Sequence, residues 1–379
     1  MLAAIALAAV VQMDCLDKTC VAVQENGRVL VWGEYEPITQ LKRDTPREVD
    51  GLDGVSKALA GSRFFLALKR DGTVWSWGYN AYGVLGDHTG PGQMLRDTTT
   101  PVRVSGLSEV VDIEAGTGET AFAIKADGTL WAWGKADDGS LGVGVRDPAW
   151  RNMAHPQPFP MQVTGLPRVR QVSAGLYHAL ALLEDGRVVG WGSNQQGAVG
   201  DGTTESRWEP VEVKGLRDAV AVAAGFKVSL AVLKDGTVRV WGSNASGILL
   251  DGTREGFSAE PRPVAGITTG VDARAGGAFF LVRLRDNTLR CWGHSAWGAC
   301  GEGKTGGYTM AVATPRNVSG VEWFGAGANS GFAKLSGGRI VGWGAVYVEP
   351  TASWKYHTPF AVELTPEGWA RPDGRRPPA

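Results

Sequence analysis

The sequence predicts an all-β protein folded as a seven-bladed β-propeller, and three repeated features of the chain predict it. A Trp-Gly pair recurs seven times in 379 residues, at intervals of 45 to 58 residues. A turn dipeptide precedes each pair, and a proline follows each. No long segment has the periodicity of a helix. Repeated units of about fifty residues with these features are typical of four-stranded propeller blades.

The seven repeat tryptophans are expected to lie in the core of the ring. Their fixed place beside a glycine in every unit favours packing between neighbouring sheets over an exposed surface that stacks bases or sugars. They are Trp32, Trp77, Trp133, Trp191, Trp241, Trp292 and Trp343.

A turn dipeptide lies in each unit, with its second residue five positions before the tryptophan. The dipeptides are Asn26-Gly27, Asp71-Gly72, Asp127-Gly128, Asp185-Gly186, Asp235-Gly236, Asp286-Asn287 and Gly337-Gly338. Because these residues tolerate positive φ, we expect each dipeptide to form a two-residue hairpin turn. The flanking runs are rich in β-branched and aromatic residues, as strands are. A third run before each hairpin ends in small residues, and its glycine is expected to let one strand turn sharply into the next.

A proline three residues before a Val marks a fourth strand, because proline belongs on a sheet edge. These prolines are Pro46, Pro101, Pro160, Pro210, Pro261, Pro315 and Pro359. The first hairpin, within residues 10–33, is interpreted as lacking its own proline strand, and the segment TPFAVEL at 358–364 as the spare one. We therefore expect one blade to combine the N-terminal hairpin with the C-terminal strand, which would close the ring and remove exposed sheet edges.

The predicted organisation has three parts. Residues 1–9 are apolar and are either a leader remaining from a clipped signal peptide or a direct lead into the first strand, since Val10 precedes Trp32 by the same 22 residues that separate Val111 from Trp133. Residues 10–364 form a single propeller, and the Pro-rich residues 365–379 form a flexible tail.

These units resemble the regulator of chromosome condensation repeat family, whose seven blades carry a small-residue pair, a His, a DG turn, WG and a G-x-L-G-D-G-T loop. The fullest match is AGLYHALALLEDGRVVGWGSNQQGAVGDGTT, which begins at Ala174. The family His is present only as His178. The other six blades have Thr19, Phe64, Thr120, Val228, Phe279 and Ser330 at that position.

The four cysteines form two local pairs, Cys15 with Cys20 and Cys291 with Cys300. The even, paired distribution favours two disulfides, and the first pair brackets a predicted hairpin loop. Disulfides would place the protein in an oxidising compartment, extracellular or periplasmic. The alternative is four buried thiols in a cytoplasmic protein.

Composition and spacing exclude several classes of site. The net charge of −1 provides no field for nucleic acid, and no segment is suited to membrane insertion. The five histidines lack metal-ligand spacing, and no catalytic signature appears, so we expect no metal, no cofactor and no enzyme activity. The stretch GACGEGKT at 298–305 fits a phosphate-binding loop letter for letter, but a propeller loop lacks the strand and helix that this motif needs.

The loops after the Trp-Gly pairs are expected to leave the blades on one face, and two of them, 79–99 and 135–158, are enlarged. Such loops often carry function, and these contain residue types that are frequent in binding hot spots. The candidate partner-binding residues are Tyr82, His88, Met94, Trp150, Met153, His155, Phe159, Trp208, Phe257 and Trp297. For any one of them, packing within its own loop is the alternative.

The sequence therefore predicts a protein-binding scaffold, a monomer that uses the loop-rich face of a propeller. The family resemblance implies two other partner classes: a secreted enzyme inhibitor, as in one branch with the same propeller, and a guanine nucleotide exchange factor, as in the nuclear founder. No wedge hairpin for exchange can be placed in this chain. An enzyme with a site on the propeller face is a further alternative.

Overall fold

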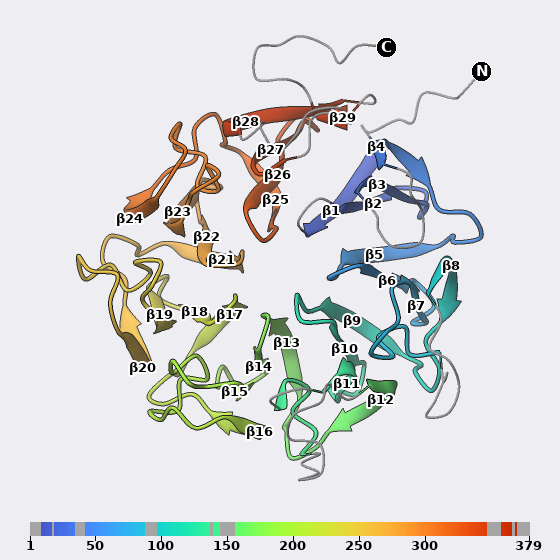
Figure 1. Ribbon diagram of the computed structural model, residues 1–379, viewed down its shortest axis with the longest axis horizontal. Helices are drawn as coiled ribbons and strands as arrows, with labels where there is room; N and C mark the ends of the chain where they lie inside the picture. Colours follow the sequence, from blue (N-terminus) through green and yellow to red (C-terminus); the bar gives the residue numbers. More distant parts are fainter. Residues whose placement is uncertain are drawn as a thin grey trace.

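The computed structural model describes residues 9–16, 19–34, 42–87, 97–136, 139–144, 156–346, 358–365 and 368–369. In these ranges the chain forms seven antiparallel sheets arranged in a ring around one axis (Figure 1). Each sheet is one blade, with its first strand nearest the axis and its fourth at the rim. The predicted all-β propeller with seven four-stranded blades is confirmed.

The blades are numbered I to VII in chain order. Blade I contains β1 (Val10–Leu16), β2 (Thr19–Gln24), β3 (Val29–Glu34) and β4 (Lys42–Glu48); blade II β5 (Val55–Ala60), β6 (Phe64–Lys69), β7 (Val74–Gly78) and β8 (Thr98–Arg103); blade III β9 (Val110–Ala115), β10 (Thr120–Lys125), β11 (Leu130–Lys135) and β12 (Pro156–Val163). Blade IV contains β13 (Val169–Ala174), β14 (His178–Leu183), β15 (Val188–Gly192) and β16 (Arg207–Glu212); blade V β17 (Ala219–Ala224), β18 (Val228–Leu233), β19 (Val238–Ser243) and β20 (Phe257–Pro263). Blade VI contains β21 (Gly270–Ala275), β22 (Phe279–Leu284), β23 (Leu289–His294) and β24 (Tyr308–Ala313); blade VII β25 (Val321–Ala326), β26 (Ser330–Leu335), β27 (Ile340–Gly344), β28 (Thr358–Thr365) and β29 (Gly368–Trp369).

The hairpin turns between second and third strands are one residue longer than predicted. In blade V, the amide of Leu233 donates to the carbonyl of Thr237, and the amide of Gly236 donates back to Leu233. The turn therefore has three residues, 234–236, and only Gly236 has positive φ, +84°. Asp235 accepts hydrogen bonds from the amide and hydroxyl of Thr237. The same two backbone bonds recur in all seven blades.

The prolines of the fourth strands lie in bulges. In blade V, residues 259–261 lie opposite the single residue Trp241, so Pro261 occupies a position where the ladder needs no amide donor. Six of the seven predicted prolines lie within fourth strands. The prediction for Pro315 is wrong, because β24 ends at Ala313.

The expected closure by strands from both termini is also wrong. Blade I is built from consecutive residues and has its own proline strand, β4, which contains Pro46, while β28 pairs with β27 of its own blade. Blades VII and I instead meet face to face. Lys334 Nζ donates to the carbonyl of Val10 (3.0 Å), and Val10 packs in one buried cluster with Phe332. The short strand β29 lies within residues 365–379, where a flexible tail was expected.

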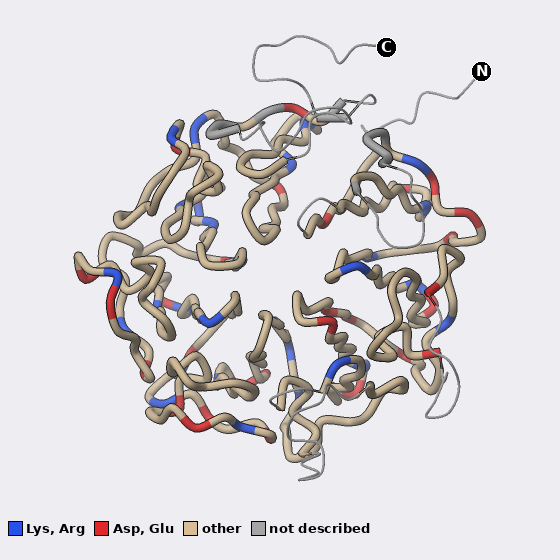
Figure 2. The backbone as a smooth tube through the Cα atoms, in the orientation of Figure 1, with Lys and Arg blue, Asp and Glu red and all other residues tan. Residues whose placement is uncertain are grey.

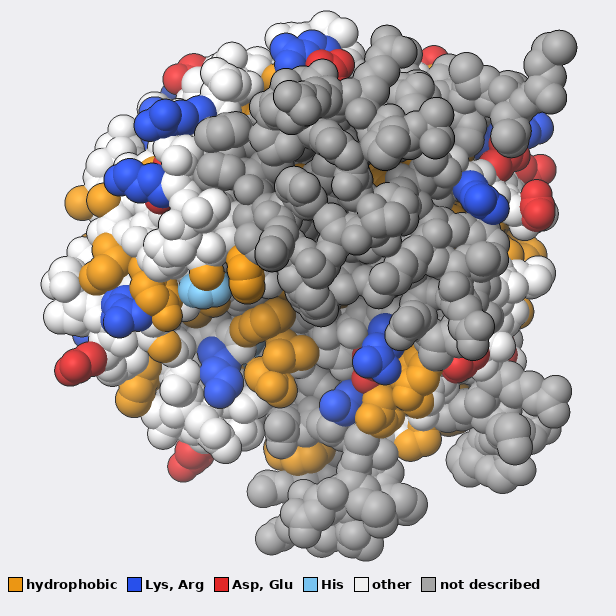
Figure 3. Space-filling view, turned by 45° about the horizontal axis from the view of Figure 1, so that its top comes forward, with side chains coloured by type: hydrophobic (Ala, Val, Ile, Leu, Met, Phe, Trp, Pro, Cys, Tyr) orange, Lys and Arg blue, Asp and Glu red, His pale blue; other side chains and the backbone are white. Residues whose placement is uncertain are grey.

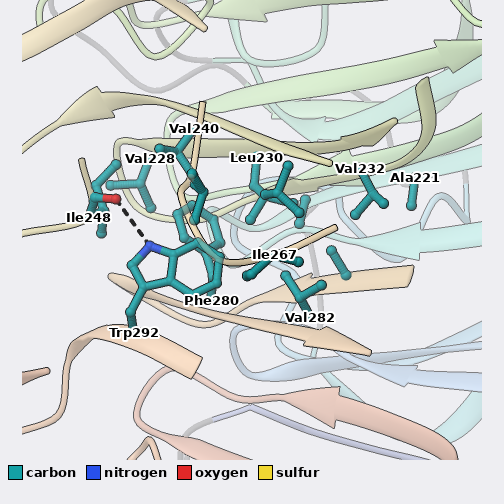
Figure 4. Close-up of a cluster of buried hydrophobic side chains, with 14 of the residues drawn as sticks. Ala221, Val228, Leu230, Val232, Val240, Ile248, Ile267, Phe280, Val282 and Trp292 are labelled. Carbon is teal, nitrogen blue, oxygen red and sulfur yellow. Dashed lines mark hydrogen bonds between the residues drawn. The ribbon is translucent and has the colours of Figure 1, made fainter. Parts of the chain in front are cut away.

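All seven repeat tryptophans are buried, at most 5% exposed, which confirms their predicted place in the core. Each buried cluster joins two neighbouring blades, as Figure 4 shows for blades V and VI around Trp292. The indole of Trp292 donates to the carbonyl of Ile248 in the loop of the preceding blade (3.0 Å). Four other indoles do the same: Trp133 to Val84, Trp191 to Ser140, Trp241 to Ala198 and Trp343 to Ala299. The loop after one Trp-Gly pair thus receives the tryptophan of the next blade.

The turns between first and second strands crowd together near the axis. A Cβ atom on Gly175 would lie 2.0 Å from the carbonyl oxygen of Gly225 in the next blade, and one on Gly225 would lie 2.7 Å from that of Gly276. The glycine is therefore required because neighbouring turns touch. The expected reason, a sharp turn of the chain, is wrong, because the φ angles of Gly175 and Gly225 lie outside the left-handed region.

Two disulfides are present, as predicted, and both flank blade VII. Cys15 and Cys20 are directly paired residues of β1 and β2, and both pack in the cluster that joins blades I and VII. Cys291 is bonded to Cys300, beside the carbonyl of Ala299 that accepts the indole N–H of Trp343. Because blade VII shares no strand with blade I, we infer that the disulfides brace the seam of the ring.

Removal of the second disulfide, by Cys291→Ala with Cys300→Ala, is expected to lower the free energy of unfolding by about 2 kcal/mol, since it releases a short closed loop. Hydrogen exchange should rise in β25–β27 while it stays unchanged in blades III and IV. An equal rise in every blade would contradict the proposed bracing of the seam.

Candidate protein-interaction face

The loops after the Trp-Gly pairs lie on one face of the disc, together with the turns that join first and second strands. Backbone bonds link the two sets: the amide of Ser193 donates to Tyr177, that of Ser243 to Lys227, and that of His294 to Ala278. We call this surface the WG face. Its described loop segments are 79–87, 139–144, 193–206, 244–256 and 295–307, and its turns include 61–63, 175–177, 225–227 and 276–278. The Asp-Gly hairpin turns lie at the other ends of the strands.

The described WG loops are held by buried polar side chains. Asn244 is fully buried; its amide group donates to Asp251 and to Thr253, and its carbonyl oxygen accepts from the amide of Leu249. Asn194 makes the equivalent bonds in blade IV. Because each loop also accepts the tryptophan of the next blade, these loops form a fixed scaffold for the side chains on them.

Three of the ten candidate binding residues are exposed aromatics on or beside this face. Phe257 is 45% exposed at the start of β20, Trp297 is 40% exposed in its loop, and Phe159 is 38% exposed in β12. Tyr82 is half-buried with Lys135 Nζ 5.1 Å from its ring centre. Trp208 is half-buried, and its carbonyl accepts from the amide of Gly144 in the neighbouring loop. His88, Met94, Trp150, Met153 and His155 lie outside the described residues.

Two further exposed aromatics of the WG face, Tyr308 and Tyr177, were not predicted from the sequence. Tyr308 is 41% exposed and occupies the position in blade VI that Phe257 occupies in blade V, since each pairs with the second residue after its tryptophan. Aligning the fourth strands by register would have found Tyr308. Tyr177, 40% exposed in a turn near the axis, stands directly before the family His position.

Cations stack on the tyrosines of this face. The guanidinium of Arg254 lies 4.0 Å from the ring centre of Tyr308, and Lys227 Nζ lies 5.7 Å from that of Tyr177. In Figure 3, hydrophobic side chains gather around a histidine with Lys and Arg side chains beside them.

The family resemblance that the repeats indicate was compared with known protein families. Residues 3–282 match the model of the RCC1-like domain. The chain belongs to the RCC1-like domain family. The relatives of this RCC1-like chain include the human E3 ubiquitin-protein ligase HERC2, which is 34% identical over an alignment of 192 residues that covers 48% of this chain and 4% of HERC2. The Arabidopsis thaliana ultraviolet-B receptor UVR8 is 29% identical over 209 residues, 52% of this chain and 44% of UVR8.

Solved structures share the fold of this RCC1-like chain. Prp20p from Saccharomyces cerevisiae, studied for its binding to Gsp1p and histones, has a TM-score of 0.73 and 21% identity over 90% of this chain and 87% of its own. Human WBSCR16 has a TM-score of 0.74 and 19% identity, and the match covers 89% of this chain and 94% of WBSCR16. Yeast RCC1 (Prp20) is also similar in its complex with Kap60, with a TM-score of 0.71 and 22% identity over 86% of this chain and 79% of that one.

The RCC1-family His is a buried link between blades here. His178 is 2% exposed, and its Nε2 lies 2.7 Å from the hydroxyl of Ser229 in blade V. That hydroxyl donates to the carbonyl of Ala198, so Nε2 carries the hydrogen and donates to Ser229. Burial lowers the pKa of His178 to about 4, so the imidazole is neutral at pH 7.

The inner strands of the RCC1-like ring carry polar side chains that bind the backbone of the next blade. Figure 2 shows charged residues along these strands near the axis. The amide of Gln12 pairs with both the N–H and the C=O of Ala58, and Gln171 does the same with Val222. Glu114 accepts from the amide of Ala174. These contacts occupy the free edges of the inner strands and hold the blades in register.

Two carboxyl groups of this inner set are hard to ionise. Desolvation is the main cause that raises the pKa of Glu114 to about 7 and of Asp14 to about 6, and Lys57 opposes both shifts. At these two groups the folded chain binds protons that the unfolded chain releases between about pH 4 and 7, so their contribution to stability falls as pH rises through this window, whereas that of His178 rises between about pH 4 and 6.5.

We expect Glu114→Gln to raise the melting temperature more at pH 8 than at pH 5, because Glu114 is forced to carry a buried charge only at the higher pH. The glutamine oxygen can still accept from Ala174, and for a half-buried group the gain should be on the order of 1–2 kcal/mol. Thermal melts at both pH values check this, with Glu25→Gln as control, since Glu25 is exposed and has no ion pair among the described residues. Parallel pH profiles for Glu114→Gln and wild type would contradict the account.

The described residues contain no group of three His, Cys, Asp or Glu side chains that could hold a metal ion. None of them forms a helix long and apolar enough to cross a membrane. The phosphate-loop look-alike at 298–305 joins two strands, β23 and β24, and its Glu302 carboxylate accepts from the hydroxyl of Thr309.

Proposed function

We propose that this RCC1-like chain is a protein-binding module without catalysis of its own, acting as a monomer through the WG face. The observation that carries the proposal is the set of exposed aromatics on blades V and VI, namely Phe257, Trp297 and Tyr308, with Arg254 over the ring of Tyr308. Aromatic residues and Arg are the types that dominate binding energy at protein interfaces. The fixed loops beneath them support it, because ordered side chains lose little entropy when a partner binds.

Protein partners of a similar propeller support the same proposal. Prp20 has been described in a complex with Kap60 and in binding to Gsp1p and histones. At 21% to 22% identity this likeness concerns the fold, and the partner of the present chain is a separate question. Enzyme inhibition and nucleotide exchange are both forms of protein binding, and the identity of the partner would distinguish them.

The two disulfides support an oxidising location, and we propose export to the periplasm or the cell exterior. A net charge of −1 supports a protein partner over nucleic acid.

Substitution of the exposed aromatics tests the proposed function. We expect Trp297→Ala with Phe257→Ala to weaken capture of the natural partner by at least about tenfold, since hot-spot residues each contribute more than 1 kcal/mol, while the melting temperature stays near that of wild type. Val111→Ser is the matched control, because Val111 is 58% exposed but lies on the inner strand β9. Full capture by the double variant would remove blades V and VI from the site.

A further inference from the structure

The strongest unexplained feature of the WG face is a row of three side chains that runs from blade V into blade VI, with a guanidinium over one ring and a second ring tilted against the first. The guanidinium of Arg254 lies 4.0 Å from the ring centre of Tyr308, and the ring of Tyr308 lies 5.3 Å from that of His294. His294 and Tyr308 are paired residues of β23 and β24. The row therefore joins the loop 244–256 of blade V to two strands of blade VI.

Stacking of this kind leaves the donors of Arg254 available. A guanidinium that lies on an aromatic ring uses its face, and its five N–H groups point outward in its own plane, where they match a carboxylate. No carboxylate among the described residues forms an ion pair with Arg254 or with Lys227. The nearby carboxylates of Asp251 and Glu302 already accept hydrogen bonds from Thr253 and Thr309.

Apolar surface accompanies these cations. Trp297 and Phe257 are 40% and 45% exposed on the same two blades, and Met310 packs close to Gly247 at the join between them. Lys227 and Tyr177 repeat the pairing of a cation with a tyrosine nearer the axis. The WG face thus presents the N–H donors of Arg254 and Lys227 together with exposed aromatic rings.

We propose that this row binds an acidic segment of a partner protein, in which an Asp or Glu carboxylate meets Arg254 and a neighbouring aromatic or aliphatic side chain packs on Trp297. The inference rests on the proposed function and names the chemistry of the partner. Arg254 is a discrete cation with the acidic residues Asp251 and Glu255 close to it in the sequence, which suits a single carboxylate on a protein, whereas a continuous phosphate backbone would be repelled.

The test uses a random linear peptide library displayed on phage and selected on the full chain. Selected peptides are expected to contain Asp or Glu next to an aromatic or aliphatic residue, and their affinity, measured by fluorescence anisotropy, should fall with added salt. Arg254→Glu should weaken them by at least about tenfold, and Arg254→Gln should also weaken them without the repulsion. Lys234→Glu, on the hairpin turn at the opposite end of blade V, is the matched control and should change nothing.

A charge swap makes the test specific. Replacement of the peptide carboxylate by Lys should abolish binding to wild type and restore it to Arg254→Glu. Selected peptides that lack acidic residues and bind Arg254→Glu as tightly as wild type would overturn the inference. If such peptides nevertheless lost affinity for Trp297→Ala, the proposed function would stand. Peptides whose affinity is unchanged by every substitution on the WG face would overturn both the inference and the proposed function. If a single-stranded oligonucleotide bound more tightly than the selected peptides, and lost this binding with Arg254→Glu, the inference that the partner is a protein would be overturned.

Discussion

Trp191→Ala is expected to lower the free energy of unfolding by about 3 to 5 kcal/mol, the usual cost of removing a large buried aromatic side chain. Trp191 has no exposed surface, and its indole N–H donates to the carbonyl of Ser140 across the boundary between blades III and IV (2.9 Å). Its ring also lies 6.1 Å from that of Phe122 in blade III. The substitution therefore leaves a cavity and an unpaired buried carbonyl at the same place.

Chemical denaturation of purified Trp191→Ala measures this cost, and Trp191→Phe separates its two parts. The phenylalanine keeps much of the packing but loses the hydrogen bond to Ser140, so we expect a smaller loss, of about 1 to 3 kcal/mol. If Trp191→Ala unfolded at the same denaturant concentration as wild type, the tryptophan could not be the link between blades that the structure describes.

Gly175→Ala is expected to destabilise the ring by an amount on the order of 3 kcal/mol, although it adds a single methyl group. The added Cβ would lie 2.0 Å from the carbonyl oxygen of Gly225, and the next closest atoms are also backbone atoms of blade V. Backbone atoms in a packed turn cannot move aside as a flexible side chain can. Blades IV and V would therefore have to separate near the axis.

Gly165→Ala is the control for Gly175→Ala. Gly165 has φ of +76° and no atom within 4 Å of an added Cβ, so its substitution costs only the strain of a left-handed conformation, about 1 kcal/mol. Denaturation midpoints should therefore rank Gly175→Ala below Gly165→Ala, and Gly165→Ala below wild type. The reverse order would mean that conformation, and not the closeness of the blades, requires glycine at position 175.

The blades could be predicted from the sequence because the pattern that marks each strand recurs seven times. The Trp-Gly pair, the turn glycine and the fourth-strand proline each follow from a local requirement: a packed indole, a left-handed residue or a bulge without an amide donor. Closure of the ring could not be derived in the same way. It depends on contacts such as that of Lys334 with Val10, which are far apart in the chain and have no repeated signature.

Only part of the candidate site could be predicted from the sequence, because its contacts between blades have no repeated signature. Phe257 and Trp297 were recognised as loop aromatics, and both are exposed. Trp208 has the same local context, but the loop of blade III packs against its backbone and it is half-buried. The stacking of Arg254 on Tyr308 joins two blades, so the contact between them could not be predicted from the sequence of either repeat alone.

Hydrogen exchange of the chain, alone and in complex with its natural partner, tests the central claim most directly. If the WG face is the protein-binding surface, the partner should protect amides in the loops 193–206, 244–256 and 295–307 and leave the opposite hairpin turns, such as 234–237, unchanged. Protection confined to the hairpin turns would contradict the claim.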